Sequence, residues 1–171
     1  MQIDIFTWYY IFAAELTVLY SLSANELPPS HSMFPATSFP STAVAFQYTL
    51  DGRVTKMVEF GSDKKLDIVQ CDKSDFQYWV IAPYLPNNLS LLGELTKIIA
   101  VSETRYSEFI FISYSNTLMM KVRGAPNEVV MTSFYYKNTG TTQTISCYIG
   151  TTGINILSIG DDPKAASCTA M

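Results

Sequence analysis

From Thr42 onward, apolar and polar residues alternate in short runs, and turn residues separate the runs about every 8–12 positions. In "TAVAFQYTL" the apolar residues between 44 and 50 fall on one face of an extended chain. Asp51-Gly52 follows, a strong signal for a tight hairpin, and "RVTKMVEF" (53–60) continues the alternation. Because a repeat of two residues is the period of a β-strand, this pattern predicts a hairpin at the start of an all-β body.

Similar runs continue to residue 159 and predict about ten strands in all. We expect residues 65–71 and 76–82 to pair across "DKSD", and we assign 93–101 to a strand because its β-branched residues favour strand over helix. The further strands are expected at 108–114, 117–123, 128–136, 143–149 and 154–159. Turn signals at this spacing predict an antiparallel β-sandwich, jelly-roll-like, over residues 42–160, with a C-terminal tail at 161–171.

Two turns in this body carry recognisable residues. The stretch "KVRGAPNEVVMTSFYY" (121–136) has two strand-like runs that flank Gly-Ala-Pro-Asn, which predicts a hairpin. "YIGTTGIN" (148–155) has two glycines, but strand patterns flank it on both sides. A cofactor-binding glycine loop needs a strand followed by a helix, so a second hairpin turn is the simpler interpretation.

The N-terminal residues 1–24 contain an apolar run at 5–24 that is interrupted by Glu15. Three alternatives fit it: a secretory signal peptide, a retained helix that associates with a membrane or partner, and an ordinary packed helix. The small residues within 21–24 favour the signal peptide, whereas Glu15 and the lack of Lys or Arg before the run oppose it. Residues 25–41 hold four prolines and predict a Pro/Ser-rich linker.

Composition excludes several classes of function. Only 15% of residues are charged while 48% are hydrophobic, and the net charge is −4. Residues 1–52 contain no Lys or Arg, so no basic face is present to neutralise phosphates and nucleic acid is not an expected partner. The single histidine, His31, lies in the linker, which removes mechanisms that place an imidazole beside a nucleophile. No cofactor-binding pattern is present, and we expect no cofactor and no catalytic residues.

The three cysteines, Cys71, Cys147 and Cys168, stand far apart and form no CxxC pair, which disfavours a zinc site. If the protein is secreted, one disulfide is possible and one thiol remains, with the pairing open. Burial of Cys147 as an apolar residue is the alternative. The acidic segment 63–75 also contains lysines, so a solvated edge is favoured over a calcium site.

The loop "APYLPNNLS" (82–90) holds the clearest modification signal, since Asn88-Leu89-Ser90 is an N-glycosylation sequon. The same loop contains Tyr84, and Trp79 stands on the strand before it. Exposed aromatic side chains stack on sugar rings or other ligands, so these two residues are candidate ligand-binding positions. Packing in the core or at its rim is the alternative.

Residues 117–133 and 145–159 resemble the first half of the farnesoic acid O-methyltransferase-like domain. That family has a strand ending in Val-Lys-Ala, an Asn/Asp-containing turn, a strand ending in Leu-Thr-Ser, and then an aromatic-Ile-Gly-Gly-x-Gly-Asn run. The residues that stand in these places are Val122-Arg123-Gly124, Asn127, Met131-Thr132-Ser133, Tyr148-Ile149-Gly150 and Gly153. The family's histidine in the second strand and its Trp-rich C-terminal half have no counterpart. The resemblance implies a β-sandwich recognition domain, and nominally methyl transfer.

These observations favour a non-enzymatic β-sandwich module, secreted or associated with a membrane through residues 5–24, that binds a ligand, a glycan or a protein partner. We therefore expect an extracellular or secretory-pathway location. The first alternative is a structural subunit of an assembly, such as a jelly-roll capsid or coat protein or an accessory subunit, in which aromatic strand faces bury against neighbours. The second is an enzyme of the class that the family name implies.

Overall fold

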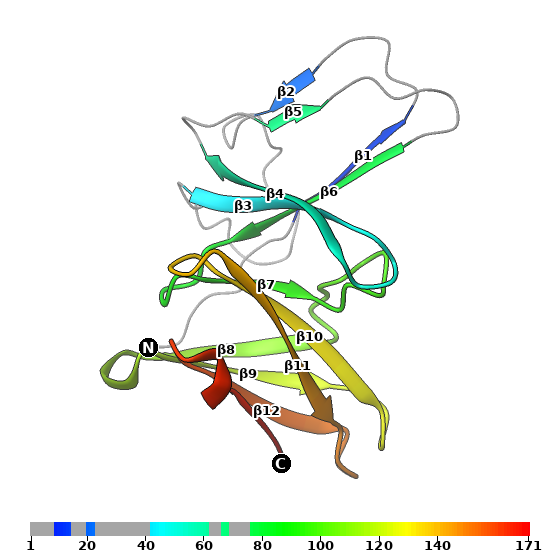
Figure 1. The fold of residues 1–171 in the computed structure, drawn as a ribbon. Coiled ribbons are helices and arrows are strands. Elements are labelled where there is room, and N and C mark those ends of the chain that lie inside the picture. Colours follow the sequence, from blue (N-terminus) through cyan, green and yellow to red (C-terminus); the bar gives the residue numbers. More distant parts are fainter. Residues whose placement is uncertain (1–8, 15–19, 23–41, 62–65, 69–75) are drawn as a thin grey trace. The chain divides into compact units, whose positions relative to one another are not determined.

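A computed structural model describes residues 9–14, 20–22, 42–61, 66–68 and 76–171 (Figure 1). These residues belong to two compact units, an N-terminal unit within Phe6–Tyr84 and a C-terminal unit, Leu85–Met171. Every strand pairing described is antiparallel, which confirms the predicted all-β class. The boundary between the units lies inside the range 42–160 that the sequence analysis treated as one sandwich domain.

The N-terminal unit contains a four-stranded sheet in the order β1-β6-β3-β4 and a separate pair, β2-β5. The strand bounds are β1 Tyr9–Ala14, β2 Tyr20–Leu22, β3 Thr42–Tyr48, β4 Val54–Gly61, β5 Leu66–Ile68 and β6 Phe76–Pro83. The predicted hairpin at Asp51-Gly52 is confirmed, since β3 pairs with β4. Its loop closes by a bond from the Thr49 N–H to the Arg53 carbonyl, and Gly52 adopts the left-handed φ of 87° that favours glycine there.

Two predictions for this unit are corrected. Residues 9–14 and 20–22 are strands, where the sequence analysis allowed a helix, and the aromatic and β-branched residues of "YYIF" suit an extended chain. The predicted pairing of 65–71 with 76–82 is not seen in the described part of these segments, because β5 pairs with β2, and β6 lies between β1 and β3. The signal-peptide alternative concerns processing and stays a prediction. Within the described ranges, no helix has the length and apolar character needed to span a membrane.

The C-terminal unit consists of two sheets. One has the order β11-β10-β7 and the other β13-β12-β9-β8. The strand bounds are β7 Leu89–Gly93, β8 Tyr106–Ile112, β9 Thr117–Arg123, β10 Val129–Tyr136, β11 Thr141–Tyr148, β12 Ile154–Ile159 and β13 Ser167–Ala170, with short 3-10 turns η2 Ser113–Ser115 and η3 Pro163–Ala165. The chain forms two-strand hairpins, β8–β9, β10–β11 and β12–β13, and changes sheet between them.

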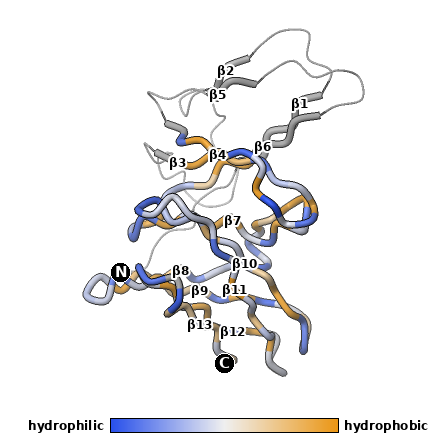
Figure 2. The backbone as a smooth tube through the Cα atoms, viewed as in Figure 1, coloured by the Kyte–Doolittle hydropathy of each residue, from blue (hydrophilic) through white to orange (hydrophobic). Residues whose placement is uncertain are grey.

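The core of this unit lies between its two sheets. Alternate residues of β9, from Leu118 to Val122, are buried, and β10 and β12 repeat this alternation; Figure 2 shows the hydropathy along these strands. The hydroxyl of Tyr106 on β8 bonds Thr132 Oγ1 on β10 at 3.1 Å, which joins the sheets through the core. Phe134 is fully buried, and a side chain of this kind contributes about 1.5–3 kcal/mol on burial.

The stretch 121–136 is not a hairpin. Its two strands, β9 and β10, pair in different sheets, so Gly124–Glu128 forms an arch that carries the chain from one sheet to the other. The turn 149–153 likewise carries the chain from β11 to β12. The two arches contact each other, since the Gly124 N–H donates to the Gly153 carbonyl and the Asn127 N–H to the Ile149 carbonyl. The turn residues were read correctly as turns, but local patterns do not specify which strands pair.

The predicted strand at 93–101 is also wrong. The strand of this region is β7, Leu89–Gly93, and residues 94–100 form a loop that closes through a bond from the Glu94 N–H to the Ala100 carbonyl. All five residues of β7, including the polar Ser90, are buried, so buried and exposed positions do not alternate along it. Such a strand is easily misread, whereas the β-branched residues Ile98 and Ile99 are exposed in the loop.

Candidate functional site

The two aromatic residues suggested for ligand stacking do not form an exposed platform. Trp79 on β6 is only 1% exposed, and the ammonium of Lys56 lies 5.1 Å from its ring centroid. Tyr84 follows β6 and is half-buried. Core and rim packing, the alternative that the sequence analysis left open, describes both positions.

The sequon lies at the start of β7. Asn88 is exposed and has a left-handed φ of 58°, while Leu89 and Ser90 are buried in the strand. The Asn88 side chain is therefore accessible in the folded unit. The burial of Ser90 places no limit on modification of a nascent chain that has not yet folded. Asn88 stays a predicted glycosylation site.

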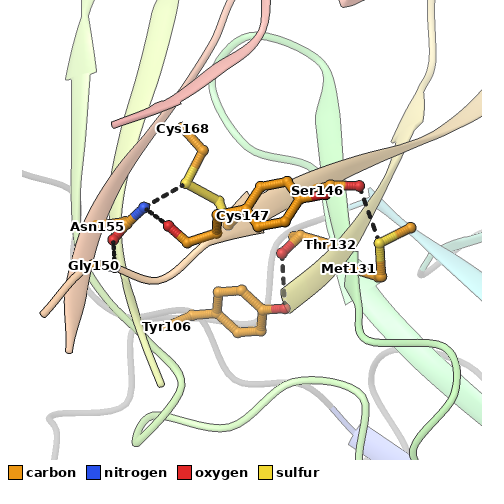
Figure 3. Close-up of a disulfide and its surroundings, with 9 residues drawn as sticks. Tyr106, Met131, Thr132, Ser146, Cys147, Gly150, Asn155 and Cys168 are labelled. Atoms are coloured by element: carbon orange, nitrogen blue, oxygen red, sulfur yellow. Dashed lines mark hydrogen bonds between the residues drawn. A yellow bond between two sulfur atoms is a disulfide. The ribbon is translucent and has the colours of Figure 1, made fainter. Parts of the chain in front are cut away.

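Cys147 and Cys168 form a disulfide with a Cα–Cα distance of 5.4 Å (Figure 3). Cys147 is on β11 and Cys168 is on β13, so the bond joins edge strands of the two different sheets. Such bonds persist in oxidising compartments. Cys71 lies outside the described residues.

Asn155 stabilises the turn 149–153, which lies beside this disulfide. Its side-chain amide donates to the Tyr148 carbonyl at 2.8 Å and approaches Cys168 Sγ at 3.5 Å, and its oxygen accepts the Gly150 N–H at 3.0 Å (Figure 3). A Cβ on Gly150 would lie 2.8 Å from the Cβ of Ala170. The residues that carry the family resemblance in this turn therefore have structural roles.

A cavity of about 400 Å³ lies in the C-terminal unit, between the 94–105 segment and the end of β9. Its lining combines three basic side chains, one carboxylate, two hydroxyls and an exposed apolar side chain. These residues are Lys97, Arg105, Arg123, Glu94, Ser102, Thr104 and Ile99, with Ala100 and Gly124 completing the wall. This volume lies within the range of small-molecule sites, and it is the candidate binding site.

Gly93 shapes one wall of the cavity. It has a φ of 80°, and a Cβ at this position would lie 2.1 Å from the Ala100 carbonyl oxygen. The loop 94–100 can therefore fold back against the end of β7 only because residue 93 has no side chain. The turn that follows is closed by the N–H groups of Arg105 and Tyr106, which both donate to the Ser102 carbonyl.

Arg105 connects the segments that form the cavity. Its Nε donates to Glu94 at 2.7 Å, and its Nη2 donates to Glu128 at 2.6 Å. Its Nη1 donates to Glu128 at 3.1 Å and also to the carbonyl of Arg123. The side chain is 15% exposed. A largely buried guanidinium with two carboxylate partners fixes the relative positions of these loops.

Glu128 belongs to the same network. Its pKa is lowered from 4.5 to about 2, first because Arg105 donates hydrogen bonds to the carboxylate and then because the Ala125 N–H donates another. The bond with Glu128 is also the main reason that the pKa of Arg105 is raised. Both groups therefore stay ionised over the physiological pH range, which keeps the arch charged and fixed.

Arg123 is the cavity cation with the weakest partner. Its Nη2 lies 3.9 Å from Glu108, whereas the ammonium of Lys121 lies 2.6 Å from that carboxylate. The Arg123 side chain is 42% exposed. By contrast, Glu94 receives both Arg105 and Lys97, the latter at 2.8 Å. Arg123 is therefore the lining guanidinium best able to meet a ligand.

Sequence reasoning missed this cavity because the segment 93–101 was assigned to a strand. The available signal was the dense succession of charged and hydroxyl residues from Glu94 to Arg105, which is unusual in a chain with so few charges. The side chains of the acidic segment 63–75 lie outside the described part of the structure. Among the side chains that are described, no group of His, Cys, Asp or Glu is arranged to hold a metal ion.

The described residues therefore define an all-β protein whose C-terminal unit has a polar cavity between its loops. No family model matches the chain, and no curated protein matches it in sequence.

Proposed function

We propose that this chain is a non-enzymatic binding module that takes a small ligand in the cavity between residues 94 and 124. The single observation that carries this proposal is the construction of the cavity. Polar side chains converge on a volume of ligand size, and Arg105, with its carboxylate partners, holds the surrounding loops in place before any ligand arrives. Preorganisation of this kind lowers the cost of binding.

The state of the cavity carboxylate supports binding over catalysis. Glu94 is only 8% exposed and carries two cationic partners, Lys97 and Arg105. A carboxylate whose oxygens both contact cations is held in place by them and is not free to approach a substrate. The hydroxyls of Ser102 and Thr104 bond each other at 3.0 Å, and hydroxyl pairs of this kind suit recognition of polar ligands.

Secretion is part of the proposal. The disulfide between the two sheets and the accessible sequon asparagine, Asn88, support a secretory-pathway location. The resemblance to the farnesoic acid O-methyltransferase-like domain remains a proposal of kinship. What supports it is that its two matching segments meet in space, through the bond from Gly124 to Gly153.

The experiment is a thermal-shift screen of mono- and oligosaccharides and small organic acids against three proteins. Thr104 is exposed at the cavity, so Thr104→Trp fills the site without disturbing the core. Thr142→Trp places the same side chain on β11, at an exposed position that does not line the cavity. A cavity ligand stabilises the natural chain and Thr142→Trp but not Thr104→Trp. Ligands that stabilise all three proteins equally would show that the cavity is not the site.

A second candidate function, a subunit of an assembly, is favoured by a different observation. Val129 of β10 stands opposite Tyr148 of β11, and Met131 follows on the same outward face. Their exposed fractions are 44%, 72% and 43%, so an apolar patch lies on this sheet. Light scattering after size exclusion tests it: a wild-type oligomer that Met131→Lys with Tyr148→Lys converts to a monomer supports assembly, and a wild-type monomer contradicts it.

A further inference from the structure

We infer that the ligand of the cavity is a small hydroxylated carboxylate, such as an acidic sugar, whose carboxylate binds Arg123. This inference rests on the proposed function and narrows it to one ligand class. It starts from charge. The lining carries three basic side chains against one carboxylate, in a protein whose net charge is −4. Glu128 and Glu108, outside the lining, pair with Arg105 and Arg123, so an anionic ligand is expected at the lining cation whose ion pair is longest, Arg123.

The three lining cations are not equivalent. Arg105 uses its donors on Glu94, Glu128 and a backbone carbonyl, and Lys97 pairs with Glu94. Among the residues that the structure describes, the Arg123 side chain has one ion-pair partner, Glu108, at the long distance of 3.9 Å. Glu108 forms a much shorter ion pair with Lys121, at 2.6 Å, so its charge stays compensated when Arg123 binds a ligand.

Arg123 is also placed to bind a carboxylate. It is the last residue of β9 and lines the cavity, and its backbone is fixed on both sides. Its N–H donates to the Arg105 carbonyl, and its own carbonyl accepts from Arg105 Nη1. The planar fork of a guanidinium binds a carboxylate through two parallel hydrogen bonds, which a single ammonium cannot do. Glu103, in the adjoining turn, is exposed and does not line the cavity.

The rest of the lining suits a hydroxylated body. Ser102 and Thr104 present hydroxyls, each able to donate and accept. Ile99 adds an apolar surface with 60% exposure, against which the C–H face of a sugar ring can pack. A bare carboxylate such as acetate would use only one part of this lining, and a neutral sugar would leave Arg123 without its partner.

The carboxylate can come from the end of a glycan or from a free hydroxy acid. Calorimetric titration of the full chain with methyl glucuronide, gluconate and methyl glucoside distinguishes these sources. We expect both carboxylates to bind roughly 10–100-fold more tightly than the neutral glucoside, as for hydrogen bonds to a charged group. Tighter binding of the glucuronide identifies a glycan end, and tighter binding of gluconate identifies a free hydroxy acid; either order supports the class.

Arg123→Gln is the decisive variant, because it removes the charge and the guanidinium fork while keeping a polar side chain. Lys164→Gln is its control, since Lys164 is exposed, does not line the cavity and carries the same charge. We expect Arg123→Gln to abolish the preference for carboxylates and Lys164→Gln to leave it intact. Circular dichroism spectra of both variants that match the natural chain show that each is folded.

Different results would overturn the ligand class and the binding function. If a neutral ligand binds as tightly as the carboxylates and Thr104→Trp blocks it, the carboxylate class is overturned while the binding module stands. The same holds if Arg123→Gln keeps the full preference for carboxylates. If neither these three compounds nor the wider screen yields a ligand that Thr104→Trp blocks, both are overturned.

Discussion

At the scale of single residues, Arg105, Glu128 and Gly93 determine the form of the cavity. Arg105 is the common partner of Glu94 and Glu128, which lie far apart in the sequence. Gly93 gives the loop after β7 space to fold back. The effects of these residues on stability are separable, because Arg105 and Glu128 act through their charges and Gly93 acts through the space that its missing side chain leaves.

Replacement of Glu128 by Gln should lower the free energy of unfolding at pH 7 by about 1–2 kcal/mol, because charged hydrogen bonds to Arg105 become neutral ones. The folded pKa of Glu128, about 2, lies below its ordinary value of 4.5. Its contribution to stability is therefore complete above about pH 4.5 and is lost as the pH falls toward 2.

Urea denaturation between pH 7 and pH 3 measures this contribution. Glu128→Gln should lose less stability than the natural chain as the pH falls through this window. Glu103→Gln is the control, since its exposed side chain makes none of these contacts. Parallel pH profiles for the natural chain and Glu128→Gln would refute the stabilising role of this ion pair.

Replacement of Gly93 by Ala should destabilise the protein more than replacement of Gly140 by Ala. Both glycines have a left-handed φ, 80° and 66°, so both changes carry the same backbone cost of about 1–2 kcal/mol. A Cβ at 140 meets nothing within 4 Å, whereas a Cβ at 93 meets the Ala100 backbone. Overpacking should add about 1–3 kcal/mol to the cost of Gly93→Ala. Equal unfolding free energies for the two variants would contradict this account of the loop.

At the scale of elements, the sequence predicted where most strands lie but not how they pair. Alternation in β9 and β10 marks strands because each has one face that is more buried than the other. The fully buried β7 has no alternation, and the loop after it was mistaken for a strand. A turn of Gly, Pro and Asn looks the same in a hairpin as in the arch at 124–128, because pairing depends on contacts remote in sequence. The cavity was missed for a related reason, since Glu94 and Arg123, remote in sequence, line the same cavity only because of this topology.

The Cys147–Cys168 bond should be the main attachment of β13. This strand has four residues and buries little of its surface, so its pairing with β12 alone holds it weakly. The bond closes a loop of 21 residues, and its removal should cost about 3 kcal/mol. Hydrogen exchange of the Cys147→Ser, Cys168→Ser variant should show lost protection in β13, while the β10–β11 hairpin stays protected. Retained protection of β13 would argue against this role.

At the scale of the whole molecule, the two units make separate contributions. The C-terminal unit contains the cavity, the disulfide and Asn88, while the N-terminal unit contains the sheet built around β3 and β6. Cleavage of a signal peptide near residues 21–24 would remove β1 and β2, which pair with β6 and β5. Cleavage of a signal peptide would therefore change the strand pairing of the N-terminal unit.

The secretory-pathway proposal predicts an N-glycan on Asn88 and an oxidised Cys147–Cys168 pair in protein from its native source. Intact mass spectrometry with and without glycosidase and reductant measures both, together with the N-terminal residue. Asn88→Gln should remove the mass of one glycan. Protein that retains Met1, carries no glycan and has reduced cysteines would contradict secretion.

The central claim is that the loops of the C-terminal unit form a ligand site. Its most direct test is a two-dimensional ¹⁵N–¹H titration of the chain with the tightest ligand from the screen. The account predicts shifts concentrated in the backbone amides of residues 93–105 and 123–128, including Arg123, and small elsewhere. Shifts that cluster on the outer face of β10 and β11, or in the N-terminal unit, would contradict it.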